Sequence, residues 1–135
     1  MEHIEGISLQ ALLKQRPSRK LPEEHCKDIF VQMLKALDYL HERHVAHRDI
    51  KLENVLIEHS TNKVKLIDFG FACQSKDKLR VLCGTPSYMS PEIVSKKDYY
   101  GPQSDIWAVG ILLYTLICGT FPFKSSFEKE LYRKI

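Results

Sequence analysis

The stretch His47-Arg48-Asp49-Ile50-Lys51-Leu52-Glu53-Asn54 gathers charged and amide side chains between two apolar parts of the sequence. Fourteen positions after Asn54 the chain reads Asp68-Phe69-Gly70, at the end of a short apolar run. Together the two stretches supply a carboxylate to accept the proton of a hydroxyl, a cation to balance a phosphoryl group, and oxygen ligands for Mg²⁺. Phosphoryl transfer depends mostly on positioning and charge neutralisation, so the pattern predicts that chemistry.

Before this stretch, the spacing of apolar residues predicts a long amphipathic helix that begins after Pro22, a residue suited to a first helical turn. Its apolar positions are Cys26, Ile29, Phe30, Met33, Leu34, Leu37 and Leu40. Further upstream, Ser8 is expected to cap a short helix. That helix carries Leu9, Leu12 and Leu13. Residues 16–20 contain a proline and several basic side chains and are predicted to form a loop.

After the decisive stretch, residues 55–57 and 64–67 are short runs of β-forming residues separated by a polar segment, which predicts a hairpin. Residues 70–104 are rich in Gly, Pro, Ser and Lys and are expected to be mostly irregular. Such a long loop in a compact domain is usually functional.

The last third of the chain predicts two more helices. One covers about residues 103–118 and ends at Gly119, a good residue for a helix C-terminus. The other begins near Phe127. The predicted fold class is therefore mainly α with a small β-hairpin.

Composition narrows the function classes. Hydrophobic residues make up 44% of the 135 residues, which is typical of a globular domain, and the net charge of +3 comes without a basic run that would indicate binding to nucleic acid or membrane. The longest apolar stretch, 106–118, is too short to span a bilayer, and the start does not resemble a signal peptide. The four cysteines form no C-x-x-C pair, so we expect reduced thiols in a cytoplasmic or nuclear protein rather than a zinc site.

The pattern H-R-D-x-K-x-x-N followed by D-F-G resembles the catalytic and metal-binding signature of eukaryotic serine/threonine protein kinases. The resemblance implies that Asp49 orients the attacking hydroxyl and accepts its proton, and that Lys51 stabilises charge on the γ-phosphoryl group of ATP. It also implies that Asn54 and Asp68 hold Mg²⁺. The implied substrate is a protein with a Ser or Thr acceptor.

A second block supports the resemblance. Residues 84–92 are similar to the segment that closes a kinase activation loop, with Ser90 where the family has alanine. There Thr85 is expected to hydrogen-bond Asp49 and Lys51. Asp105 lies in a pattern similar to the buried central helix of the large lobe, where it would accept hydrogen bonds from the catalytic-loop backbone. Residues 83–86 and 119–123 look most like the calcium/calmodulin-dependent and AMP-activated kinase group.

The resemblance also implies a nucleotide site. Residues 1–6 are similar to the hinge between the two kinase lobes, where backbone groups of Glu2 and Ile4 would meet the adenine edge and Leu56 would form the floor beneath it. The implied cofactor-binding set is Glu2, Ile4, Glu53, Asn54, Leu56 and Asp68. Glu53 is in addition a candidate contact to a basic residue upstream of the phosphoacceptor.

The resemblance covers residues 1–135 as one partial kinase domain, from the hinge through the start of the helix after the central helix, and thus a large (C-terminal) lobe truncated at both ends. The sequence contains no G-x-G-x-x-G loop and no V-A-I-K lysine. We therefore expect this chain alone to be inactive. The alternatives are a non-catalytic, pseudokinase-like binding module and a fragmentary gene model of a complete kinase. The oligomeric state stays open.

Two positions carry further expectations. Glu92 is expected to be an inward-facing carboxylate whose arginine partner lies beyond the sequence. Val81 stands where many relatives have a phosphorylatable threonine, so the complete enzyme is expected not to depend on a phosphate at that position.

Overall fold

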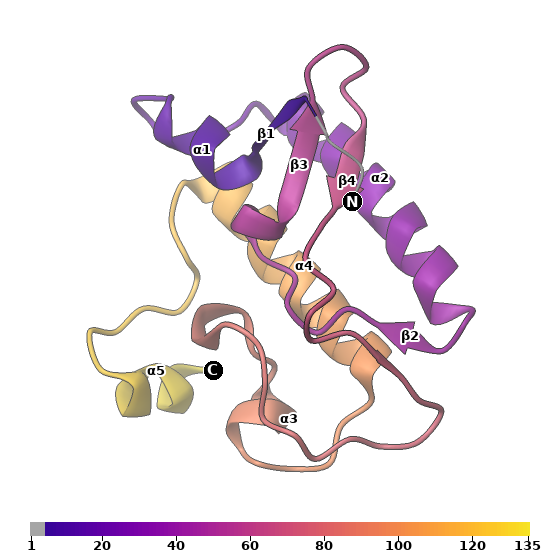
Figure 1. The fold of residues 1–135 in the computed structure, drawn as a ribbon. Coiled ribbons are helices and arrows are strands. Elements are labelled where there is room, and N and C mark those ends of the chain that lie inside the picture. Colours follow the sequence, from indigo (N-terminus) through magenta and orange to yellow (C-terminus); the bar gives the residue numbers. More distant parts are fainter. Residues whose placement is uncertain (1–4) are drawn as a thin grey trace.

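The computed structural model describes residues 5–135 as a helix-rich domain with two small antiparallel sheets (Figure 1). The elements in chain order are β1 (Gly6–Ser8), α1 (Leu9–Lys14), α2 (Glu23–His41), β2 (Val45–Ala46), the 3-10 turn η1 (Leu52–Asn54), β3 (Val55–Glu58), β4 (Val64–Leu66), β5 (Cys73–Gln74), the 3-10 turn η2 (Pro86–Tyr88), α3 (Pro91–Val94), α4 (Gly101–Cys118) and α5 (Glu128–Lys134).

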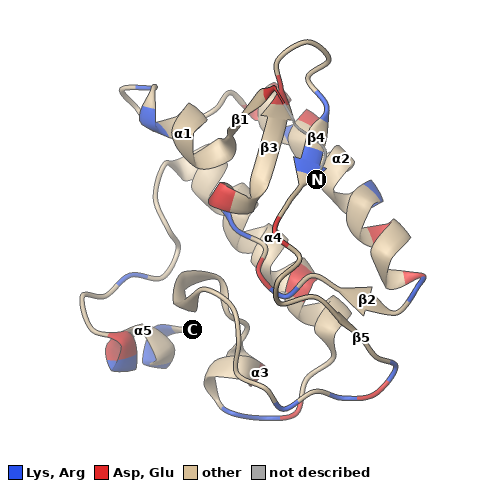
Figure 2. Ribbon diagram, viewed as in Figure 1, with Lys and Arg blue, Asp and Glu red and all other residues tan. Residues whose placement is uncertain are grey.

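The core of the domain is built around α4, which packs against α2. Figure 2 shows that α4 carries almost no charged side chains along its length. A helix that is apolar on nearly all sides is stable only when it is buried, and α4 accordingly contributes many of the core residues. The fully buried core side chains of α2 and α4 include Met33, Leu37, Val109, Leu112 and Leu116.

The predicted helices near the start of the chain are confirmed. Ser8 caps α1, because its hydroxyl accepts a hydrogen bond from the Ala11 amide at 3.1 Å. Pro22 directly precedes α2, whose first turn is acidic and whose buried face follows the predicted spacing. The buried side chains of α1 and α2, such as Leu9, Leu13, Ile29 and Leu37, belong to the same core cluster as those of α4.

The predicted hairpin is confirmed as β3 and β4, with Val55 opposite Leu66 and Ile57 opposite Val64. The structure adds a third strand, which the sequence did not indicate: β1 pairs antiparallel with β3 and gives the sheet order β1-β3-β4. A strand of three residues shows no periodicity of its own. Its pairing with a segment about fifty positions later makes it a strand, and only the tertiary structure reveals that.

A second sheet, β2 paired with β5, was also not predicted. These strands have two residues each, too few for an apolar pattern to develop. The start of α4 lies against this sheet, and Gly101 makes the approach possible: a Cβ at this position would lie 2.5 Å from the Cβ of Ala46. The β2–β5 sheet and the start of α4 therefore pack closely against each other, directly before residues 47–54.

Residues 70–104 are less irregular than expected, since they contain β5, η2 and the short helix α3. The predicted helix over 103–118 begins two residues earlier, at Gly101, and ends as predicted: Gly119 adopts a left-handed conformation with φ of 72°. The predicted last helix is confirmed as α5, which begins at Glu128.

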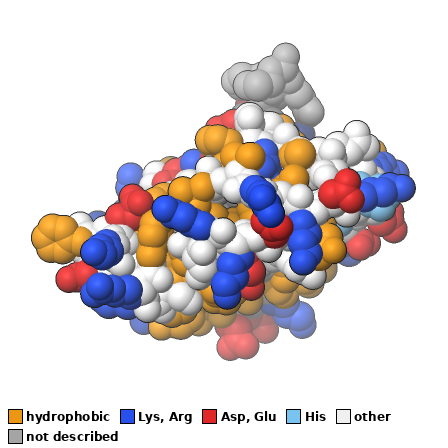
Figure 3. Space-filling model, turned by 90° about the horizontal axis from the view of Figure 1, so that it is seen from below, with side chains coloured by type: hydrophobic (Ala, Val, Ile, Leu, Met, Phe, Trp, Pro, Cys, Tyr) orange, Lys and Arg blue, Asp and Glu red, His pale blue; other side chains and the backbone are white. Residues whose placement is uncertain are grey.

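Lysine and arginine residues are dispersed along the chain (Figure 2), and on the face drawn in Figure 3 their side chains are interspersed with acidic and apolar ones. In the described part of the chain, no helix combines the length and the apolar character that crossing a membrane requires. All four cysteines are free thiols; Cys26 and Cys83 are buried.

Candidate active site

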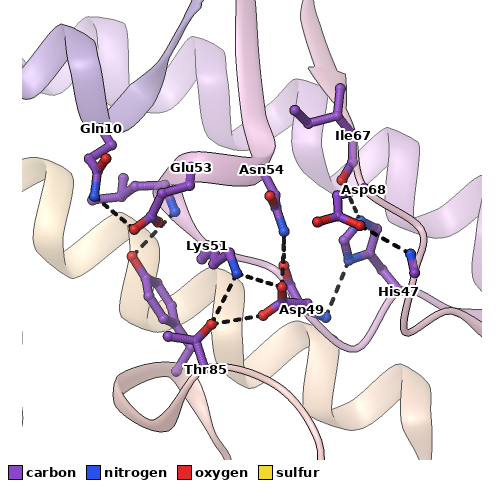
Figure 4. A network of polar contacts seen from close by, with 12 residues as sticks. Gln10, His47, Asp49, Lys51, Glu53, Asn54, Ile67, Asp68 and Thr85 are labelled. Atoms are coloured by element: carbon purple, nitrogen blue, oxygen red, sulfur yellow. Dashed lines mark hydrogen bonds and ion pairs between the residues drawn. The ribbon is translucent and has the colours of Figure 1, made fainter. Parts of the chain in front are cut away.

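The predicted catalytic stretch forms a loop that leaves β2, passes through η1 and enters β3 (Figure 4). Its backbone is fixed by one buried side chain of the central helix. Asp105 accepts hydrogen bonds from the His47 amide at 2.9 Å and from the Arg48 amide at 2.8 Å. These bonds hold Arg48 in a left-handed conformation with φ of 65°, which is unfavourable for a side chain of this size. The prediction that Asp105 binds the loop backbone is confirmed.

The same carboxylate has a third partner. The His41 Nε2 atom, from the last turn of α2, lies 2.9 Å from Oδ2 of Asp105. Asp105 is 1% exposed, and a buried carboxylate is tolerated only when donors surround it. The central helix, the long helix and the catalytic loop therefore meet at one residue.

At the centre of the site, Asp49 is 4% exposed and its carboxylate is contacted by three side chains. Lys51 donates from Nζ to Oδ2 at 2.6 Å, and the Thr85 hydroxyl donates to Oδ1 at 2.9 Å. The Asn54 amide nitrogen donates to Oδ2 at 3.1 Å and to the Asp49 backbone carbonyl at 2.9 Å. Lys51 also reaches the Thr85 hydroxyl at 3.2 Å. The predicted contacts of Thr85 with Asp49 and Lys51 are confirmed.

Asp68 lies beside this cluster because the chain segment before it is bound to the catalytic loop. The Ile67 amide donates to the Asn54 carbonyl at 3.0 Å, and His47 donates from Nε2 to the Ile67 carbonyl at 3.0 Å. Asp68 itself is exposed, has a left-handed backbone with φ of 60°, and accepts the Gly70 amide at Oδ1. The ring of the next residue, Phe69, packs edge-on against the His47 ring, with 4.8 Å between the two ring centroids.

An oxygen-liganded cation fits this arrangement. Both amide hydrogens of Asn54 are directed at Asp49, so its side-chain oxygen is left for a ligand. Within residues 5–135, Oδ2 of Asp68 has no hydrogen bond. Mg²⁺ takes one or two protein oxygens and keeps several waters, so two such groups suffice. Within residues 5–135, His, Cys, Asp and Glu side chains form no group of three that could hold a metal ion, which leaves no competing site there.

The remaining predicted residues lie at the margins of the cluster. Glu53 is exposed in η1, just before β3, and accepts a hydrogen bond from the side-chain amide of Gln10 at 2.7 Å. Leu56 is half-buried in the three-stranded sheet, between Ser8 and Lys65 on the neighbouring strands. Glu2 and Ile4 fall outside the described residues.

The structure corrects the expectation for Glu92, whose side chain is exposed at the start of α3 rather than directed inward. The neighbouring Ser90 is buried instead, and its hydroxyl has no partner in the described part of the chain. The helical turn of α3 explains the difference: Ser90 and Ile93 occupy its buried side, and Glu92 lies on the other side.

Two tyrosines that the sequence reasoning missed complete the site. The buried Tyr88 hydroxyl accepts the Leu52 amide at 3.2 Å, which satisfies the backbone at the end of the catalytic loop. Burial raises the pKa of Tyr88, so the hydroxyl keeps its proton at neutral pH. Tyr99 is buried too and donates to the Val81 carbonyl at 2.8 Å. In the sequence, the one hint of these roles is that both tyrosines lie among turn-forming residues, which is a weak signal.

This geometry brings a buried carboxylate, a lysine, an amide and a second carboxylate together in a helix-rich domain. The chain belongs to the protein kinase family: the family described as "Protein kinase domain" matches residues 1–135. NUAK family SNF1-like kinase 1 of Mus musculus is 44% identical over 137 residues, which cover 100% of this chain and 20% of that protein. CBL-interacting protein kinase 15 of Oryza sativa subsp. japonica is 41% identical over 140 residues, covering 100% of this chain and 32% of that protein.

CBL-interacting serine/threonine-protein kinase 15 of Arabidopsis thaliana is 38% identical over 140 residues, again with 100% of this chain and 32% of that protein covered. The predicted resemblance to serine/threonine protein kinases of the AMP-activated group is confirmed by these matches. The chain spans between a fifth and a third of the length of these relatives.

Proposed function

We propose that this chain is the large-lobe part of a serine/threonine protein kinase that transfers the γ-phosphate of Mg-ATP to a protein Ser or Thr hydroxyl. The proposal places residues 1–135 within one kinase domain, in a cytoplasmic or nuclear protein. The observation that carries it is the set of hydrogen-bonding positions left open around Asp49. Asp49, Lys51 and Asn54 are held by hydrogen bonds to their neighbours, and each of them, like the exposed Asp68, keeps at least one position that no described residue occupies.

The first open position belongs to Asp49. A carboxylate offers about four acceptor positions. On Oδ2 two are taken by Lys51 and Asn54, and on Oδ1 one is taken by Thr85. The remaining position on Oδ1 can accept the hydroxyl of a substrate serine or threonine, orient it and take its proton. A positioned base of this kind contributes about 10²- to 10⁴-fold to the rate.

The second belongs to Lys51. Of its three N–H donors, one is directed at Asp49 and one at Thr85. The third can meet the oxygens of the transferred phosphoryl group. Asn54 and Asp68 would hold Mg²⁺, which when bound neutralises phosphate charge. The protein's task is then mainly to hold these groups in place before the substrate arrives.

The deciding experiment uses a complete kinase domain that contains this sequence. Asp49→Asn should lower kcat by about 10²- to 10⁴-fold and leave Mg-ATP affinity nearly unchanged, because the base is lost and the metal ligands stay. Asp68→Asn should weaken Mg-ATP binding as well. The matched control is Asp38→Asn, an exposed carboxylate on α2 without a side-chain partner among the described residues. Equal losses of nucleotide affinity in the Asp49 and Asp68 variants would contradict these roles.

A non-catalytic binding module is the second candidate. These 135 residues contain neither a glycine-rich phosphate loop nor a V-A-I-K lysine. For the same reason the chain alone should not phosphorylate a generic basic peptide, since ATP would be held from one side only. Nucleotide binding without turnover in the complete domain would favour the binding module. Turnover by residues 1–135 alone would refute the expected inactivity.

Regulation by a phosphate at the usual loop position is not part of the proposal. Val81 is 62% exposed and offers no hydroxyl. We expect phosphatase treatment of the full-length protein, verified by mass spectrometry, to leave its activity unchanged. Recovery of lost activity on phosphorylation of Ser75 or Ser87 would show that the loop is phosphate-dependent after all.

A further inference from the structure

A groove of about 970 Å³ lies between the α1–α2 loop, the first half of α2, β1 and the β3–β4 turn. In Figure 1 these elements form the upper end of the molecule, and the catalytic loop lies below them. None of the residues that line the groove takes part in the polar contacts around Asp49. Its volume is near the upper limit of pockets that hold drug-sized ligands, roughly 300–1,000 Å³.

Polar and apolar side chains both line the groove, and its apolar part, which we call the floor, is built from several elements. Its apolar residues include Ile7, Leu12, Leu21, Ile29 and Ile57. Val31, on the surface of α2, adds an apolar contact at the edge and is 42% exposed. A floor of this kind gains free energy when apolar side chains of a ligand cover it, at about 25 cal/mol per Å² removed from water.

Among the described residues that line the groove, cations outnumber carboxylates: Arg16 and Lys27 stand against Asp28. The imidazoles of His25 and His59 also line it. Arg16 is half-buried, yet within residues 5–135 neither Arg16 nor Lys27 has an ion-pair partner. A half-buried guanidinium without a counter-ion has lost part of its hydration and gained no carboxylate in return. It is therefore a favourable partner for a carboxylate, which it can bind through two hydrogen bonds.

One wall of the groove is held in place before any ligand arrives. Gln32 on α2 donates to the Asn62 carbonyl at 3.3 Å and accepts the Val64 amide at 3.0 Å, so the β3–β4 turn is tied to the helix. Thr61 and Asn62, which line the groove, belong to this turn. Binding to a preformed wall avoids part of the entropy cost of ordering it.

We propose that this groove docks a short acidic segment with leucine-like side chains from a protein partner. The apolar side chains would cover the floor, and the carboxylates would pair with Arg16 and Lys27. The charge of the rim decides the class of partner, because a basic segment would be repelled and a purely apolar one would leave Arg16 unpaired. If the partner is a substrate, as the proposed kinase function implies, docking raises its local concentration near Asp49 without using the catalytic residues.

The test is a binding measurement on the 135-residue chain, which does not require kinase activity and so can fail or succeed independently of the proposed function. The probe is a fluorescein-labelled peptide in which three leucines alternate with glutamates. We expect saturable binding that weakens as salt is added. Arg16→Glu combined with Lys27→Glu should weaken it by about tenfold or more. Lys35→Glu, an exposed lysine on the same helix outside the groove, is the matched control.

Two further peptides separate the apolar and the charged contributions to binding. A peptide with serines in place of the leucines tests the contact with the floor, and one with lysines in place of the glutamates tests the contact with Arg16 and Lys27. Both should bind more weakly, and Val31→Ser should weaken the acidic leucine peptide while circular dichroism stays unchanged. Amide chemical shifts should change in the α1–α2 loop and the β3–β4 turn, and not around Asp49.

Several results would overturn the proposal. These are absent binding, equal binding of the lysine peptide, an equal loss in the Lys35→Glu variant, and shift changes confined to the catalytic loop. Concentration-dependent dimerisation that Arg16→Glu abolishes would assign the groove to a second copy of the chain. Binding of octanoate, with no binding of the peptide, would assign it to a small acidic amphiphile.

Discussion

The catalytic loop, residues 47–54, and the segment 69–82 are both irregular backbone next to the same site, yet they are held in different ways. In the loop, buried side chains satisfy the backbone: Asp105 binds two amides at its start and Tyr88 binds one at its end. The segment 69–82 has short backbone pairings and few buried contacts. Four of its large apolar side chains are exposed to solvent: Phe69, Phe71, Val81 and Leu82.

The contrast shows how a loop becomes rigid. Backbone amides buried without a partner cost free energy, so a loop can be buried only where side chains supply the missing acceptors. The central helix supplies them to the catalytic loop through Asp105. The segment 69–82 is fixed mainly by β5, by the pairing of Leu79 with Tyr99 and by the bond from Arg48 to the Phe71 carbonyl at 2.7 Å. We expect local opening there at much lower free energy than in the loop.

The largest effect should come from Asp105→Ala. The change leaves two buried backbone amides and His41 without their acceptor, which we expect to lower the free energy of unfolding by about 3–5 kcal/mol. Urea unfolding of the full chain measures it. Asp105→Asn, which keeps one acceptor oxygen, should lose less. Gln103→Ala, an exposed residue of the same helix, is the control. A loss below about 1 kcal/mol would mean that the loop does not depend on the central helix.

A smaller effect is expected for Tyr88→Phe, which removes the acceptor of the buried Leu52 amide and keeps the ring in contact with Phe121. The expected loss is about 1–2 kcal/mol by the same urea measurement. Tyr114→Phe serves as the control, since this tyrosine lies on the surface of α4 and is 44% exposed. Identical midpoints for the two variants would show that Tyr88 contributes by packing alone.

For the segment 69–82, Tyr99→Phe should cost about 1 kcal/mol, because it removes the hydrogen bond to the Val81 carbonyl together with the hydroxyl's contacts with Cys83 Sγ, at 3.7 Å, and with the Arg48 guanidinium. The more informative measurement is amide hydrogen exchange. Exchange should become faster in residues 79–83 and stay unchanged in residues 47–54. Tyr39→Phe, 59% exposed on α2, controls for the loss of a hydroxyl. Faster exchange in the catalytic loop would mean that the two regions open together.

The smallest effect should be that of Arg80→Ala. Arg80 pairs with Asp98 at 2.8 Å, but its side chain is 85% exposed, and solvent-exposed ion pairs contribute little to stability. The urea midpoint should not change measurably, at low or at high salt, and should match that of Lys76→Ala in the same segment. A clear loss at low salt alone would show that this pair holds the segment in place.

The sequence predicted those parts of the fold whose signals are local. The spacing of Cys26, Ile29 and Met33 defines one face of a helix without reference to the rest of the chain. Ser8 and Gly119 mark helix ends through their own backbone chemistry. The site residues Asp49, Lys51, Asn54 and Asp68 could be named because their order and spacing resemble a family pattern, and the structure places all four together.

Other features depend on residues far apart in the sequence. β1 and the β2–β5 pair are strands only because distant segments supply their hydrogen-bond partners. The sequence wrongly indicated that Glu92 faces inward, because the turn of α3 decides which side chain is buried.

What the sequence by itself determined is the family, the main helices and the set of groups around Asp49, since periodicity, caps and motif spacing are carried by neighbouring residues. What only the tertiary structure decided is which of these groups are held rigidly and which surfaces stay open. The roles of Tyr88 and Tyr99 arise where elements meet, and so does the position of Arg16, which has no ion-pair partner within residues 5–135, on the rim of the groove. The physical reason is that burial and hydrogen-bond satisfaction belong to the packed chain, because both depend on which distant groups exclude water from a given side chain.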